Sequence, residues 1–97
     1  MSFYTNHKTI THKQIKVYNM NKRPNQFIID TPDGKYFQSY ESIIAFIDNN
    51  GQVFLDQNRW DYSTTTGKYR NIFLGENKKL TEKRIDANIY SLVDLNN

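Results

Sequence analysis

The sequence contains no cysteine, which excludes disulfide bonds and thiolate-bound metals. It contains only two histidines, His7 and His12, and no cluster of carboxylates adjoins them. A zinc site or a serine–histidine–aspartate centre is therefore not expected. No apolar run approaches the roughly 20 residues that span a bilayer, and the N-terminus lacks the apolar stretch of a signal peptide. We expect a cytoplasmic protein that has no metal, no cofactor and no membrane contact.

The chain has 97 residues, which is enough for one domain with a modest core. Seven tyrosines, six phenylalanines and one tryptophan enlarge that core, because each aromatic ring buries a large apolar area. Residues 1–12 show no apolar periodicity and no helix cap, and they are predicted to form a flexible basic arm. Residues 13–97 are predicted to form the folded domain.

Charge is unevenly distributed along the chain, although the net charge is only +3. Residues 1–25 contain basic residues and no carboxylate, whereas residues 26–58 are mainly acidic. A basic arm of this kind is typical of proteins that contact a polyanion. The alternative is that the arm lies over the acidic hairpins of its own domain, and the small size of the excess favours this alternative.

The first half of the folded domain has the pattern of strands joined by tight turns. Residues 14–18 alternate polar and apolar side chains, and residues 26–30 and 35–40 read as two further strands. Thr31-Pro32-Asp33-Gly34 lies between them and has the residues of a hairpin turn. The apolar run 42–47 and residues 52–55 are predicted to form a second hairpin, with a short helix at 40–47 as the alternative.

The second half changes to a helical pattern. Ser63 or Thr64 is a suitable N-cap, and Gly75 is a suitable C-cap, for a helix over residues 64–74. Thr81 is predicted to begin a second short helix, and residues 89–95 alternate like a closing strand. The predicted fold class is α+β: a small antiparallel sheet of hairpins with two short helices packed on one face and a closing strand.

The segment from residue 60 to residue 71 combines aromatic rings, hydroxyls, cations and a predicted helix start. Thr66-Gly67-Lys68 resembles part of a phosphate-binding loop, but the required earlier glycine is replaced by Tyr62, so the match fails. The structural interpretation is that the aromatic residues anchor the helix while Asp61 pairs with Arg70, and we favour it. The functional interpretation is a binding site with these candidate residues: Trp60, Tyr62, Lys68, Arg70 and Asn71.

Basic residues outside this segment suggest a second kind of site, a surface for nucleic acid. The acids Glu76, Glu82 and Asp86 are interleaved with the C-terminal cations, however, which indicates local neutralisation. The residues of this candidate basic patch are Lys8, Lys13, Lys16, Lys22, Arg23, Lys78, Lys79, Lys83 and Arg84.

The chain from about residue 26 to residue 95 resembles a family of small proteins of bacteriophages and prophages in low-GC hosts. The most specific part is the string WDYSxTTxKYRNxFLG, which occupies residues 60–75. The arm lies outside this resemblance, and no catalytic residue is carried over with it. The resemblance implies a non-enzymatic accessory protein that binds a host protein stoichiometrically in the host cytoplasm. An inhibitor of a defence nuclease, similar to an anti-CRISPR protein, is its sharpest form. The alternatives are a nucleic-acid-binding protein and a structural homo-oligomer.

Overall fold

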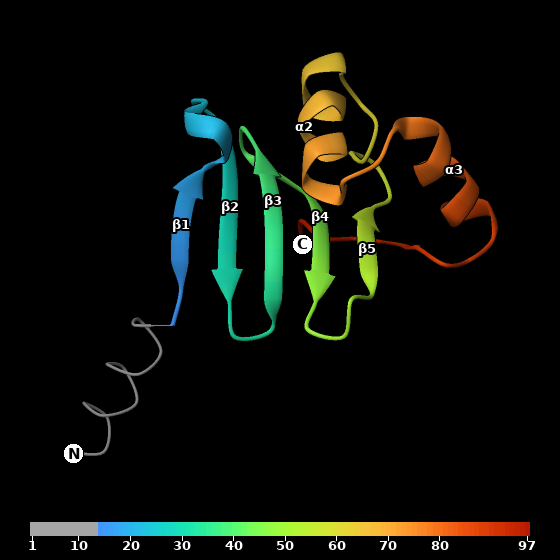
Figure 1. The fold of residues 1–97 in the computed structure, drawn as a ribbon, viewed down its shortest axis with the longest axis horizontal. Coiled ribbons are helices and arrows are strands. Elements are labelled where there is room, and N and C mark those ends of the chain that lie inside the picture. The colour runs from blue at the N-terminus through green and yellow to red at the C-terminus, as the bar shows by residue number, and fades with distance from the viewer. Residues whose placement is uncertain (1–13) are drawn as a thin grey trace.

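The computed structural model describes residues 14–97 (Figure 1). The predicted arm, residues 1–12, lies outside the described residues, as does Lys13. The described chain forms one open six-stranded sheet in which the spatial order of the strands follows their order in the sequence. The strands are β1 (Lys16–Asn19), β2 (Gln26–Thr31), β3 (Gly34–Ser39), β4 (Ser42–Asp48), β5 (Val53–Asp56) and β6 (Ser91–Val93); the helices are η1 (Met20–Lys22), α2 (Thr64–Leu74) and α3 (Lys78–Asp86).

The predicted α+β fold class is confirmed, with an almost entirely antiparallel sheet followed by two helices in the C-terminal half. Residues 42–48 form a strand and not the alternative helix, because they pair with β3 and β5 on both sides. The predicted helix over residues 64–74 is also confirmed. Ser63 caps it by accepting a hydrogen bond from the Thr66 amide at 3.1 Å, and Gly75 ends it in the left-handed region at φ 71°.

The predicted start of the second helix at Thr81 is wrong. Helix α3 begins at Lys78, and Asn77 is its N-cap, with its side-chain oxygen 2.9 Å from the Leu80 amide. Asparagine is as good an N-cap as threonine, and the earlier cap starts the helix first. Thr81 is instead fully buried inside the helix, where its hydroxyl donates to Glu76.

The closing strand is shorter than predicted and is the one parallel member of the sheet. It covers Ser91–Val93 where 89–95 was expected, and it pairs with β5 in parallel register. The parallel direction of β6 follows from the connection that precedes it. Between β5 and β6 the chain passes through α2 and α3, and a helical crossover returns the chain in its original direction. In Figure 1, α3 lies beyond the β5 edge, while α2 lies over the middle strands.

The two faces of the sheet carry different side chains. On one face, the ring of Phe73 in α2 packs 5.8 Å from that of Phe37 in β3, and the hydroxyls of Thr66 and Ser39 are 2.9 Å apart. This packing joins α2 to the hydrophobic core. The buried apolar side chains of the core are Met20, Ile28, Phe37, Ile44, Ala45, Val53, Leu55, Tyr69 and Tyr90.

The opposite face carries one apolar row that crosses five strands. Each member lies beside the next in the strand register, and Tyr36, Phe46 and Phe54 stack with centroid distances of 4.3 and 5.9 Å. The side-chain contacts that α2 makes with β3 are on the other face, so the row remains partly or largely exposed. We call it the open-face row; its members are Val17, Ile29, Tyr36, Phe46 and Phe54.

Candidate functional site

Arg70 is the centre of the segment that sequence analysis singled out. Its side chain is fully buried, and its guanidinium donates from Nη1 to the Trp60 carbonyl at 2.7 Å and to Asp61 at 3.1 Å. From Nη2 it donates to the Asn71 side-chain oxygen at 2.9 Å. It also lies over the Trp60 ring, 5.2 Å from the centroid. Arg70 therefore ties the loop before α2 to the helix itself, which confirms the predicted pairing with Asp61.

Asp61 is held as an anion between two cations. Its second carboxylate oxygen accepts from Lys78 at 2.7 Å, so that α3 is linked to the same loop. Partial burial acts to raise the pKa of Asp61, but the hydrogen bonds from Lys78 and Arg70 outweigh it, and the pKa lies below 3.8. A carboxylate with a lowered pKa and two fixed cationic partners is a weak general base at neutral pH.

Most of the remaining residues of the segment 60–71 have a structural task. Tyr69 is buried, and its hydroxyl accepts from Arg23 Nε at 2.7 Å across to the loop before β2. Ser63 caps α2, and Thr66 contacts the sheet as described above. Trp60 packs against the core while it remains partly exposed. The predicted anchoring of the helix by its aromatic neighbours holds for Trp60, which packs against the core, but not for Tyr62, which is exposed.

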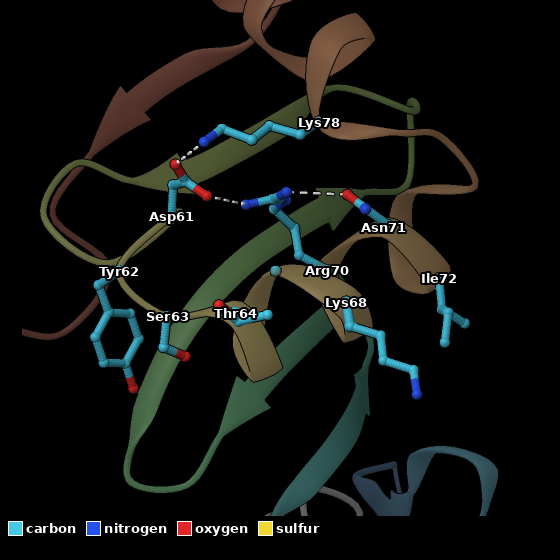
Figure 2. Close-up of a pocket in the computed structure, with 10 residues that line it drawn as sticks. Asp61, Tyr62, Ser63, Thr64, Lys68, Arg70, Asn71, Ile72 and Lys78 are labelled. Atoms are coloured by element: carbon cyan, nitrogen blue, oxygen red, sulfur yellow. Dashed lines mark hydrogen bonds and ion pairs between the residues drawn. The ribbon is translucent and has the colours of Figure 1, made fainter.

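The other residues of the segment surround an open groove of about 820 Å³ at the start of α2. Figure 2 shows Lys68 and Ile72 projecting from α2, and Tyr62 projecting from the loop before it, all away from the Arg70 hydrogen bonds. The predicted binding residues Tyr62, Lys68, Arg70 and Asn71 all line this groove, whereas Trp60 does not. Lys68 is exposed and Arg70 buried, so the two cations have separate tasks.

Tyr62 also lines a second hollow of about 640 Å³, and across it lies Tyr40, which sequence analysis missed. Tyr40 is the first residue of the two-residue turn between β3 and β4, and its φ is +56°. Glycine usually occupies that position of a hairpin turn, because a side chain is strained there. Both tyrosines are about half exposed. No sequence signal marked Tyr40, since its conformation follows from the register of the β3–β4 hairpin.

The candidate basic patch does not form one surface. Lys8 and Lys13 lie outside the described residues. Lys16, Lys22 and Arg23 lie in or next to β1 and η1, and the remaining four cations lie on α3 at the far side of the sheet (Figure 1). Two of those four are already paired, Lys78 with Asp61 and Arg84 with Glu76. Only Lys79 and Lys83 of that helix have no ion pair among residues 14–97.

A second buried polar cluster was missed by sequence analysis. The carboxylate of Glu76, which follows the α2 C-cap, accepts from Thr81 at 2.5 Å, Arg84 at 2.6 Å and Tyr90 at 2.7 Å. Burial and the hydrogen bond to Glu76 raise the pKa of Tyr90 above 10.0. Glu76 was expected only to neutralise nearby cations on the surface. The cluster instead fastens α3, through Thr81 and Arg84, to the residue that follows the C-cap of α2.

Within residues 14–97 no three His, Cys, Asp or Glu side chains are grouped as they would be to hold a metal ion. The helices of this part of the chain are all too short or too polar to cross a membrane.

The fold and the site together define a small α+β domain with an open sheet and a polar–aromatic groove. The chain belongs to a family of unknown function (DUF8033), whose model matches residues 1–88. That match includes the N-terminal arm, which the resemblance inferred from the sequence had left out. No match was found among curated proteins or among solved structures.

Proposed function

We propose that the protein is a non-enzymatic accessory protein that binds another protein stoichiometrically. The binding surface is the end of the molecule at which the two hollows meet, and we call it the tyrosine surface. Its members are Tyr40, Tyr62, Lys68 and Ile72, all of them exposed.

The observation that carries the proposal is the strained and exposed Tyr40. Its positive φ stores backbone strain in a turn where glycine would have none, and strain of this kind concentrates at functional positions. The side chain that the strain presents is a half-exposed ring beside Tyr62. Tyrosine is enriched in protein interfaces because it offers a rigid apolar ring with a polar end, and it loses little side-chain entropy on binding.

The form of the surface supports binding and not catalysis. Each tyrosine separates two hollows, since Tyr62 lines the groove at α2 and the hollow beside Tyr40, and Tyr40 also lines a smaller hollow with Tyr69. Interface hot spots are typically aromatic side chains next to such hollows. The carboxylate nearest to the groove, Asp61, is occupied by Lys78 and Arg70 and has a lowered pKa.

The resemblance to phage and prophage proteins indicates the kind of partner. A small phage protein of this kind acts in the host cytoplasm, and a host protein is then the expected target. A nuclease complex of host defence is the sharpest version of this proposal. Nucleic acid is the less favoured partner, because the candidate basic residues within 14–97 are divided between opposite ends of the sheet and two of them are ion-paired.

The test is capture from host lysate by the tagged full-length chain, with and without nuclease treatment. We expect a protein that is retained after nuclease treatment, and we expect Tyr62→Ala and Tyr40→Gly each to weaken its capture about tenfold or more. Tyr40→Gly is the sharper variant, because it removes the backbone strain and should leave the free energy of unfolding unchanged or higher. Ile89→Ala, which alters an exposed side chain near α3, serves as the control and should capture normally.

Two results would overturn the proposal. One is the loss of all bound material on nuclease treatment, which would favour nucleic acid as the ligand. The other is normal capture of the same protein by Tyr40→Gly and Tyr62→Ala while both variants are folded, which would place the interface elsewhere.

A further inference from the structure

Strand β1 is an unusually exposed edge of the sheet. All four of its residues are exposed, and Val17 retains 60 % of its accessible surface. Tyr18 of the same strand and Ile15, the residue before the strand, are also exposed large apolar side chains. Within residues 14–97 only β2 pairs with β1, so one side of its backbone has no strand partner there. Soluble domains normally protect such edges, because unpaired backbone groups and apolar side chains favour pairing with another strand.

The other edge of the sheet, strand β6, is short and is followed by a tail that is hydrogen-bonded to the domain. Strand β6 has only three residues, and the tail behind it is tied down by side chains. The Leu95 amide donates to Asp56 at 2.9 Å, and the Asn96 side chain makes two hydrogen bonds with the backbone of Ile43, at 2.7 and 2.9 Å. A short edge that continues into a fastened tail offers little to a further strand. Leu92 of β6 is exposed at that edge, whereas β1 and the residue before it expose three apolar side chains, Ile15, Val17 and Tyr18.

The open-face row also ends at this edge. Val17 is its outermost member, next to Ile29 in the register of β1 and β2. The row therefore runs from the stacked and partly exposed rings of Phe46 and Phe54 to Val17, which is its most exposed member. A strand added beside β1 would extend the row if it presented an apolar residue opposite Val17.

We propose that this strand is β1 of a second copy of the chain, paired antiparallel about a twofold axis at Val17. Residues directly opposite each other in an antiparallel pair lie on the same face, so Val17 meets Val17 of the second copy on the open face. The two six-stranded sheets become one, and the two open-face rows become one apolar band. This surface is separate from the tyrosine surface, and the inference does not rest on the proposed function.

The chemistry of the pairs selects this register. Centred on Val17, the pairing places Lys16 opposite Tyr18 of the second copy, which avoids a like-charge pair and brings an ammonium beside an aromatic ring. Within its own chain Lys16 lies opposite Asp30 in the register of β1 and β2. Centring on Lys16 would oppose two lysines, and centring on Tyr18 would oppose Val17 to a polar Asn19. The Val17 register opposes two valines at its centre without charge repulsion, and its apolar–polar pairs, Ile15 with Asn19, lie only at the ends of the paired segment.

The absence of cysteine provides a direct test by disulfide trapping. In the Val17→Cys variant the two introduced cysteines lie directly opposite each other. The Cα atoms of such a pair are about 4.5–5.5 Å apart, a distance that a disulfide can bridge. We expect this variant to form a covalent dimer under mild oxidation, at least about tenfold more than Lys16→Cys, whose thiol faces a tyrosine. Both positions are exposed, so neither substitution should prevent folding.

The oligomeric state of the unmodified full-length chain is the second test. With so short a strand we expect weak association, detectable by sedimentation equilibrium between about 1 and 500 µM. Val17→Lys should weaken the dimer about tenfold or more, because it opposes two ammonium groups, and Ile89→Lys, equally exposed but outside β1, should not.

Three outcomes would overturn the proposal. A chain that stays monomeric at the highest concentration has no such dimer. A chain that dimerises only after deletion of residues 1–12 has its β1 edge occupied by its own N-terminal segment. Equal cross-linking of Val17→Cys and Lys16→Cys would show that the copies do not meet in this register.

Discussion

Two ion pairs beside helix α2 are opposite in design: one joins Arg70 of α2 to Asp61 in the loop before it, and the other joins Arg84 of α3 to Glu76 after the α2 C-cap. In the first, the cation is buried: the Arg70 side chain is 1 % exposed, while its partner Asp61 is 30 % exposed. In the second, the anion is buried: the Glu76 side chain is 2 % exposed, while Arg84 is 40 % exposed. In each pair one member is removed from water, and the other remains at the surface. The comparison shows that one small domain can bury a charge of either sign when local donors or acceptors replace water.

The two buried charges differ in how completely they are satisfied. The Glu76 carboxylate receives hydrogen bonds from Thr81, Arg84 and Tyr90, so its acceptors are well used. Arg70 uses Nη1 and Nη2, whereas its Nε is buried without a partner. The carboxylate of Glu76 is served by donors from α3 and from Tyr90 after it, whereas a guanidinium has five donors in a fixed plane. The arginine centre is therefore the less complete of the two.

The largest expected effect comes from removal of Arg70. Arg70→Ala should lower the free energy of unfolding by about 3–5 kcal/mol, because it leaves a cavity and removes the hydrogen bonds to the Trp60 carbonyl, Asp61 and Asn71. Urea denaturation measures this directly. Lys68→Ala, on the exposed side of the same helix, is the control and should change stability by about 0.5 kcal/mol or less. A loss of stability in Arg70→Ala as small as that in Lys68→Ala would contradict the structural task of Arg70.

A smaller effect is expected at the second centre. Glu76→Gln should cost about 1–3 kcal/mol, because one end of the new amide is a donor and cannot accept from the donors that Glu76 serves. Arg84→Gln should cost about 1 kcal/mol or less, since Arg84 is partly exposed and Gln retains a donor. Thermal unfolding of both variants checks the order. A larger loss for Arg84→Gln would mean that the exposed member of the pair dominates.

The smallest expected effects are in pH dependence, and they lie at opposite ends of the scale. The folded-state pKa of Asp61 is below 3.8, so the stability that it contributes is present above that pH and is lost as the pH falls through the folded-state pKa. The folded-state pKa of Tyr90 is above 10.0, so its contribution is present below that pH and is lost as the pH rises through the folded-state value.

Two variants separate these contributions. Asp61→Asn should flatten the acid limb of the stability profile and leave the alkaline limb unchanged, while Tyr90→Phe should do the reverse. Unfolding by urea at a series of pH values measures both limbs. Flattening of the same limb by both variants would contradict the assignment of the two centres to opposite ends of the pH scale.

Local features of the candidate site were predictable from the sequence. The Ser63 and Gly75 caps depend on hydroxyl chemistry and on a positive φ, which are properties of single residues, and they bound α2 as expected. The pairing of Asp61 with Arg70 was also foreseen, because only nine positions separate the two charges across a helix start. Tyr40 was missed because no property of tyrosine marks it for a left-handed turn.

By itself, the sequence determined the strands of the hairpins, the helix over residues 64–74 and the α+β class, because periodicity, turn residues and caps act over a few positions. Only the tertiary structure decided that β6 runs parallel to β5, since that direction follows from the path of the chain through α2 and α3 before it pairs with β5. It also decided which member of each ion pair is buried and that Val17 stands at an exposed edge. Burial depends on which distant segments meet, and a single sequence carries no local signal of that.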